Sequence, residues 1–105
     1  MRRMPEGVKE FSEWARETVG PSLQLIITME EMGELTSALS HYIREPDDPL
    51  MVANVVEEIA DVLFMLEQMI SFFEITDEEL YDRIQSKLKR AASSVKAMDI
   101  VHEHL

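Results

Sequence analysis

The sequence contains no cysteine, and it has only 10 basic residues against 21 acidic ones in a chain of 105. The lack of cysteine excludes disulfides, thiolate metal ligands and a cysteine nucleophile. The formal net charge of −11 repels nucleic-acid polymers and anionic membrane surfaces, so neither is expected as a partner. A small anionic ligand remains compatible with this charge if metal ions lie between its phosphates and the protein.

Long uncharged apolar runs are also missing, because no segment approaches the length that spans a membrane. Arg2 and Arg3 are followed at once by charged residues, where a secretory signal would have apolar ones. A chain of this length with 46% hydrophobic residues is the size of one small domain. The sequence therefore predicts a single cytoplasmic domain over residues 1–105, with a mobile tail after about residue 96.

Glycine and proline are scarce, and all three glycines and four prolines lie before residue 50. Between these turn signals the apolar residues recur at three- and four-residue spacing, and no segment alternates as a strand would. This pattern predicts an all-α fold. The expected helices cover about 5–18, 21–44 and 49–73, and a fourth helix begins near residue 76.

Helix-capping residues support two of these starts. Asp48 before Pro49 is a typical N-cap, and Thr76 with Glu79 has the spacing of a capping box. The fourth helix is expected to fray after about Val95. The two long central helices are joined by a short proline turn, which favours an antiparallel four-helix bundle-like protomer.

Acidic residues interrupt the apolar stripes of both central helices. Glu31 and Glu34 are three residues apart and project from one face, and Glu58 and Asp61 repeat that arrangement. If the helices pair antiparallel about the turn, the two pairs lie at similar heights and could face each other. Glutamates at this spacing are also common on ordinary solvated helix faces, and that interpretation stays open.

Four carboxylates at close range repel one another unless some are protonated or a cation neutralises them. Oxygen ligands without cysteine or histidine suit a hard ion, Mg²⁺ first and Mn²⁺ second. A di-iron bundle would need histidine three residues after a glutamate, and neither Glu31 nor Glu58 has one there. From the residues alone, a hard-metal site is the prediction.

These residues also match a family pattern. The segment Glu31-Met32-Gly33-Glu34-Leu35 is followed by Glu58-Ile59-Ala60-Asp61-Val62-Leu63, with residues 35–57 between the two inner glutamates. The pattern resembles the MazG-like all-α nucleoside triphosphate pyrophosphohydrolases, and the resemblance covers roughly residues 8 to 95.

The resemblance implies a helical homodimer or homotetramer that hydrolyses a nucleoside triphosphate to its monophosphate and pyrophosphate. It implies that Mg²⁺ is held by Glu31, Glu34, Glu58 and Asp61, and that Glu31 or Glu34 orients or deprotonates the attacking water. By the same resemblance, Lys87 and Arg90 are expected to bind the substrate phosphates.

For the base pocket the aromatic residues Trp14 and Tyr42 are the predicted contacts, and Phe11 and His41 are candidates beside them, although aromatics at helical spacing more often belong to a core. Two alternatives to the nucleoside triphosphate enzyme stay open. One is an enzyme similar to the phosphoribosyl-ATP pyrophosphohydrolases. The other is a non-catalytic helical oligomer that binds a nucleotide or a partner protein, with eight methionines as an adaptable surface.

Overall fold

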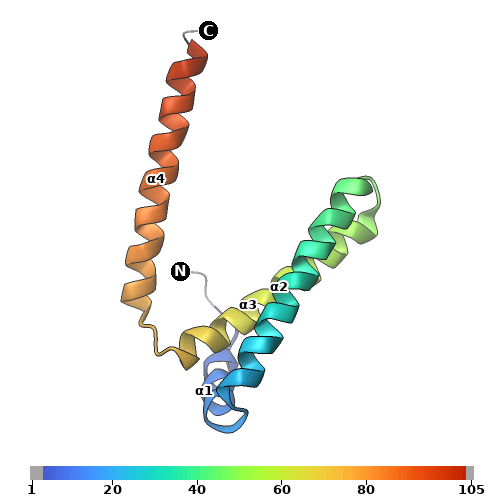
Figure 1. Ribbon diagram of the computed structural model, residues 1–105, viewed down its shortest axis with the longest axis vertical. Coiled ribbons are helices and arrows are strands. Elements are labelled where there is room, and N and C mark those ends of the chain that lie inside the picture. The colour runs from blue at the N-terminus through green and yellow to red at the C-terminus, as the bar shows by residue number, and fades with distance from the viewer. Residues whose placement is uncertain (1–3, 104–105) are drawn as a thin grey trace. The chain divides into compact units, whose positions relative to one another are not determined.

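A computed structural model describes the backbone of residues 4–103 and the side chains of residues 4–96 (Figure 1). The described part of the chain contains four helices and no strand, which confirms the all-α class. The helices are α1 (Val8–Thr18), α2 (Pro21–Arg44), α3 (Pro49–Phe72) and α4 (Asp77–Glu103).

Local sequence explains most of these boundaries. Pro21 lies in the first turn of α2, where a missing backbone N–H costs nothing. The backbone N–H of Leu50 donates to the carboxylate of Asp48 over 2.9 Å, so the predicted N-cap of α3 is confirmed. The predicted capping box of α4 is confirmed as well. There Glu79 N–H donates to Thr76 Oγ1 at 3.1 Å, and Thr76 N–H donates to Glu79 Oε2 at 3.2 Å.

Two boundaries differ from the sequence prediction. The first helix begins at Val8 rather than near residue 5, because Gly7 has a φ of 92° and cannot belong to a right-handed helix. The fourth helix continues to Glu103, beyond Val95, where the sequence predicted that it would fray. The predicted mobile tail lies mainly within this helix or outside the described side chains.

The chain divides into two compact units, of which one spans Arg2–Glu74 and the other contains α4. In the first unit α2 and α3 form an antiparallel hairpin, and α1 packs against α3 (Figure 1). Three of the predicted helices therefore assemble as one body. A four-helix bundle that includes α4, within a single domain, stays a prediction.

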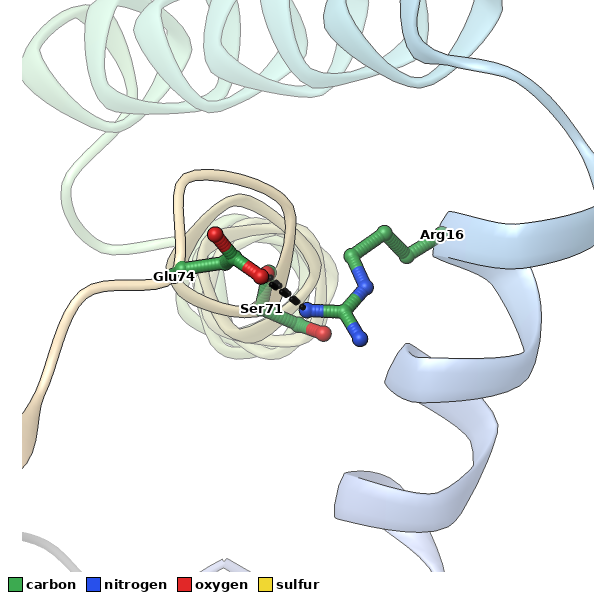
Figure 2. Close-up of polar contacts among 3 residues, drawn as sticks. All are labelled: Arg16, Ser71 and Glu74. Atoms are coloured by element: carbon green, nitrogen blue, oxygen red, sulfur yellow. Dashed lines mark hydrogen bonds and ion pairs between the residues drawn. The ribbon is translucent and has the colours of Figure 1, made fainter.

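The end of α1 is tied to the end of α3 by one arginine. Arg16 donates from Nη1 to the carbonyl of Ser71 at 3.2 Å, and the same nitrogen lies 3.5 Å from Glu74 Oε1 (Figure 2). Aromatic rings make a second contact between these helices, since the centroids of Phe11 and Phe64 are 5.3 Å apart. These two contacts hold α1 along one side of the hairpin.

The interior of this unit is unusually polar. Among the side chains that the structure describes, those classed as buried are Ser12, Ala15, Gln24, Thr28, Met65 and Gln68. Two of the buried polar side chains form hydrogen bonds within their own helix, because the Ser12 and Thr28 hydroxyls donate to the backbone carbonyls four residues earlier. The contact face of α1 is thus centred on Ser12 and Ala15. Phe11 and Trp14, which the helical spacing places close to the same stripe, are exposed.

Large apolar side chains instead cover one outer face of the hairpin. At about 100° per residue, the apolar residues of α2 lie about 80–160° around the helix axis from Glu31, and those of α3 lie about 80–160° from Glu58 in the same sense. Because the two helices are antiparallel, these two apolar stripes fall on the same side of the hairpin. The exposed residues of this apolar hairpin face are Met29, Met32, Leu39, Ile43, Val52, Val56, Ile59 and Leu66.

The apolar hairpin face lies on the opposite side from α1, which contacts Phe64 and Ser71 of α3. Its residues are well exposed, with 51% of Met32 and 62% of Val56 accessible. The three- and four-residue spacing of the apolar residues of α3 is typical of a buried face. Within the unit that spans Arg2–Glu74, those on the apolar hairpin face are exposed because the seam between α2 and α3 is narrower than the apolar stripe of α3. None of the described helices is long and apolar enough to cross a membrane.

Candidate metal centre

The four predicted carboxylates converge in the hairpin. One carboxylate oxygen from each of Glu31, Glu34, Glu58 and Asp61 lies within 4.8 Å of the other three. Glu34 and Glu58 form the pair nearer the turn, and Glu31 and Asp61 form the pair one helical turn further from it. The predicted facing of the two motifs is therefore observed.

The local sequence explains this convergence. Residues three apart on a helix project from neighbouring positions of one face, so each motif presents two carboxylates together. The Asp48 cap fixes where α3 begins after the turn, and this sets the register of α3 against α2. Glu30 and Glu57 each come one residue before a motif glutamate, so their side chains point about 100° away from it around the helix axis. Both are exposed.

Three of the four carboxylates are half-buried, and two of these three are incompletely hydrogen-bonded. Glu31 and Glu58 are half-buried, and Oε2 of each is inaccessible without a hydrogen-bond partner among the described residues. Burial raises the pKa of Glu31, and the charges of Glu34 and Asp61 raise it further. Burial likewise raises the pKa of Glu58, followed by the charges of Glu34 and Asp61. Each group would thus gain from a nearby cation.

The oxygen arrangement fits a divalent ion. Opposite ligands of an octahedral Mg²⁺ are about 4.2 Å apart, from a metal–oxygen distance of about 2.1 Å. The widest separation of 4.8 Å therefore needs side-chain shifts of only a few tenths of an ångström. Glu34 is exposed, so the cluster also communicates with the surface. Glu31, Glu34, Glu58 and Asp61 are therefore the residues of the hairpin that could hold a divalent ion.

A buried amide pair lies in the same seam and was missed by the sequence analysis. Gln24 is two helical turns before Glu31, and Gln68 is two turns after Asp61. Gln24 Nε2 donates to Gln68 Oε1 at 3.3 Å, while Gln24 Oε1 and Gln68 Nε2 have no partner among the described residues. Only 1% of Gln68 is accessible. The pair closes the seam on the side of the carboxylates that faces away from the turn.

On the other side, towards the turn, the surface is hollowed. A hollow of about 230 Å³ is lined by His41, Arg44, Glu45 and Met51. His41 and Arg44 are the only basic side chains of α2, and α3 has none. The sequence analysis offered His41 for the base pocket but did not assign Arg44, although two basic residues in the last turn of a helix next to a metal motif are a signal that could have been used.

The other predicted site residues lie elsewhere. Lys87 and Arg90 are exposed on α4, in the second compact unit, so their predicted contact with phosphates stays a prediction. Trp14 is exposed on α1, with its ring centroid 5.5 Å from that of Phe11. Tyr42 lies in the last turn of α2, at the other end of the hairpin (Figure 1). The two proposed base-pocket aromatics therefore do not adjoin each other.

Comparison with protein-family models, with curated proteins and with solved structures finds no match for this chain. The carboxylate cluster and the sequence motifs that form it are therefore the observations from which a function can be argued.

Proposed function

We propose that this protein is a Mg²⁺-dependent nucleoside triphosphate pyrophosphohydrolase that acts in the control or cleansing of the nucleotide pool. The observation that carries the proposal is the convergence of Glu31, Glu34, Glu58 and Asp61, with one oxygen from each within 4.8 Å of the others. The proposed reaction, nucleotide hydrolysis, is supported by the resemblance of the two motifs to those of MazG-like enzymes.

In this proposal the four carboxylates hold the divalent cation, with Mn²⁺ able to replace Mg²⁺. The cation would neutralise charge on the substrate phosphates, which is what phosphoryl transfer mostly requires. Glu31 or Glu34 orients the attacking water and accepts its proton. The water oxygen bonds to the α-phosphorus, the bond from this phosphorus to the bridging oxygen breaks, and pyrophosphate leaves.

The proposed enzyme is a homo-oligomer. An exposed apolar surface as continuous as the apolar hairpin face is uncommon on monomeric proteins and typically marks an association site. A second copy that packs its own apolar hairpin face there would bury both, and it would leave the carboxylate side of each hairpin accessible. The dimer is favoured because an isologous contact uses the same surface on both partners.

A substrate panel tests the activity. The protein is incubated with each ribo- and deoxyribonucleoside triphosphate and Mg²⁺, and released pyrophosphate is measured. We expect at least one substrate to be turned over, and we expect EDTA to stop the reaction. Glu58→Gln should lower turnover by at least 100-fold, whereas Glu57→Gln, which removes the same charge from an exposed neighbouring position, should retain activity.

Each result has a defined meaning. Turnover that is unaffected by Glu58→Gln would contradict the proposed site. Metal-dependent nucleotide binding without turnover would contradict the hydrolase and favour the non-catalytic nucleotide-binding oligomer. Pyrophosphate release from phosphoribosyl-ATP alone would favour the other enzyme class, so this substrate belongs in the panel.

A further inference from the structure

The hollow near the turn lies in register with the carboxylate cluster. His41 follows Glu34 by two helical turns on α2, and Met51 precedes Glu58 by two turns on α3. Two turns correspond to about 10.5 Å along the axis and to nearly the same direction around it. The hollow lined by His41, Arg44, Glu45 and Met51 therefore lies about two helical turns from the pair Glu34 and Glu58, on the side of the turn.

The side chains on the turn side of the cluster are more accessible than those on its other side. Away from the turn the seam is closed by the hydrogen bond between Gln24 and Gln68, and both side chains are buried. Towards the turn, His41, Arg44 and Glu45 are exposed and Met51 is half-buried. A ligand whose phosphates bind at the carboxylates can therefore extend its remaining part from the exposed Glu34 towards the hollow near the turn.

The lining residues suit a planar heteroaromatic group. An imidazole and a guanidinium can stack on such a ring, and the Met51 thioether provides a polarisable apolar surface. The Glu45 carboxylate can accept a hydrogen bond from a ring or exocyclic N–H. Among the described side chains neither Arg44 nor Glu45 has an ion-pair partner, so both are free to contact a ligand.

Phosphate is a poorer match to the same hollow. A carboxylate and a thioether together form half of the lining, and a carboxylate repels phosphate. The volume of about 230 Å³ is below the range of pockets that hold a whole drug-sized ligand, about 300–1,000 Å³, and is appropriate for part of one. Helical side chains also tilt towards the helix N-terminus, which directs His41 and Arg44 back towards the carboxylates.

We infer that this hollow is the base subsite, where His41, Arg44, Glu45 and Met51 contact the nucleobase of a nucleotide whose phosphates are held at the carboxylate cluster. The inference rests on the proposed function. Of the residues that the sequence offered for the base, it keeps His41 and leaves out Trp14 and Tyr42. It also makes the identity of the base depend on Arg44 and Glu45, which carry the donor and the acceptor.

The test compares ligands with and without a base. Binding to the full-length protein is measured by calorimetry with Mg²⁺ and the α,β-methylene analogues of ATP, GTP, CTP and UTP, which block cleavage at the proposed bond. Inorganic tripolyphosphate with Mg²⁺ is the base-free probe. Arg44→Ala removes the stacking surface and the donor, and Arg83→Ala, at an exposed position on α4, controls for the loss of one positive charge.

We expect at least one nucleotide analogue to bind more tightly than tripolyphosphate. Arg44→Ala should weaken that analogue about tenfold, in keeping with the usual contribution of a stacked base, and leave tripolyphosphate within twofold. Arg83→Ala should change neither. Glu45→Gln, which exchanges an acceptor-only group for one that also donates, should alter the order of preference among the four analogues.

Three results would overturn the inference. An equal loss for the analogue and for tripolyphosphate would place phosphate in the hollow. No loss in Arg44→Ala, or equal wild-type affinity for every probe, would place the base elsewhere. In these cases tripolyphosphate binding that depends on Glu58 would still support the proposed metal site. Failure of the wild-type protein to bind any probe would overturn both proposals.

Discussion

Replacing Glu31 by glutamine is expected to have opposite effects on the metal-free and the metal-loaded protein. Glu31 shares a site with three other carboxylates, and a carboxylate oxygen from each lies within 4.8 Å of the rest. Without metal, removing one of four like charges relieves repulsion, so the melting temperature should stay the same or rise. With metal, the variant lacks one charged ligand, so its gain in stability should be smaller.

The size of the metal effect follows from binding linkage. A ligand at 100 times its Kd stabilises the folded state by about 2.7 kcal/mol. For a domain of this size each 1 kcal/mol shifts Tm by roughly 4–8 °C, so the wild-type protein should gain about 10–20 °C in saturating Mg²⁺ or Mn²⁺. A tenfold loss of affinity in Glu31→Gln would reduce this gain to about half at the same metal concentration.

The assay is differential scanning fluorimetry at pH 7.5, with EDTA and then with a series of Mg²⁺ and Mn²⁺ concentrations. Glu30→Gln is the matched control, because it removes the same charge from an exposed neighbouring position. The control should behave as the wild-type protein does when metal is added. The reasoning is refuted if metal stabilises Glu31→Gln as much as the wild-type protein, or if the metal-free variant melts well below it.

Three further predictions concern pH, the buried amides and association. The folded-state pKa of Glu58 is raised above 4.5, so the metal-free protein should lose stability as pH rises from 4.5 through that pKa. The free energy of unfolding, measured by urea titration at several pH values, should fall less steeply with pH in Glu58→Gln. Gln68→Met should lower the free energy of urea unfolding by about 1–3 kcal/mol, because it leaves Gln24 unpaired. The double variant with Gln24→Met and Gln68→Met should recover most of that loss. Equal losses in the single and the double variant would contradict an energetic coupling between the two amides. Light scattering should detect a wild-type dimer. Val56→Lys should dissociate it, whereas Ser37→Lys, on the opposite hairpin face, should not. A monomeric wild-type protein would refute the association.

Local signals in the sequence were sufficient for the helices themselves. Proline in the first turn of α2, Asp48 before α3 and the Thr76–Glu79 capping box act within a few residues, so they could be read directly. The spacing of the acidic motifs also fixed which carboxylates share a helix face. The start of α1 was missed because it depends on the positive φ of Gly7, for which no local residue pattern was decisive.

Apolar periodicity showed that α3 has a broad hydrophobic stripe but not which part of it would be buried. The seam between α2 and α3 accommodates only a narrow strip of that stripe. Val56 and Ile59 consequently remain exposed, while Gln24 and Gln68 are buried. Hydrophobicity alone ranks these residues in the reverse order, because it carries no information about which helix packs on which side.

The carboxylates show the same division between sequence and tertiary structure. By itself the sequence determined two acidic pairs on two helices and the hard-metal chemistry that such oxygen donors favour. Only the tertiary structure decided that one oxygen from each of Glu31, Glu34, Glu58 and Asp61 comes within 4.8 Å of the others. It also decided that the seam is closed by amides on one side and hollowed on the other. The reason is physical: spacing along a helix is fixed by 3.6 residues per turn, whereas contact between helices depends on the register and rotation that packing selects.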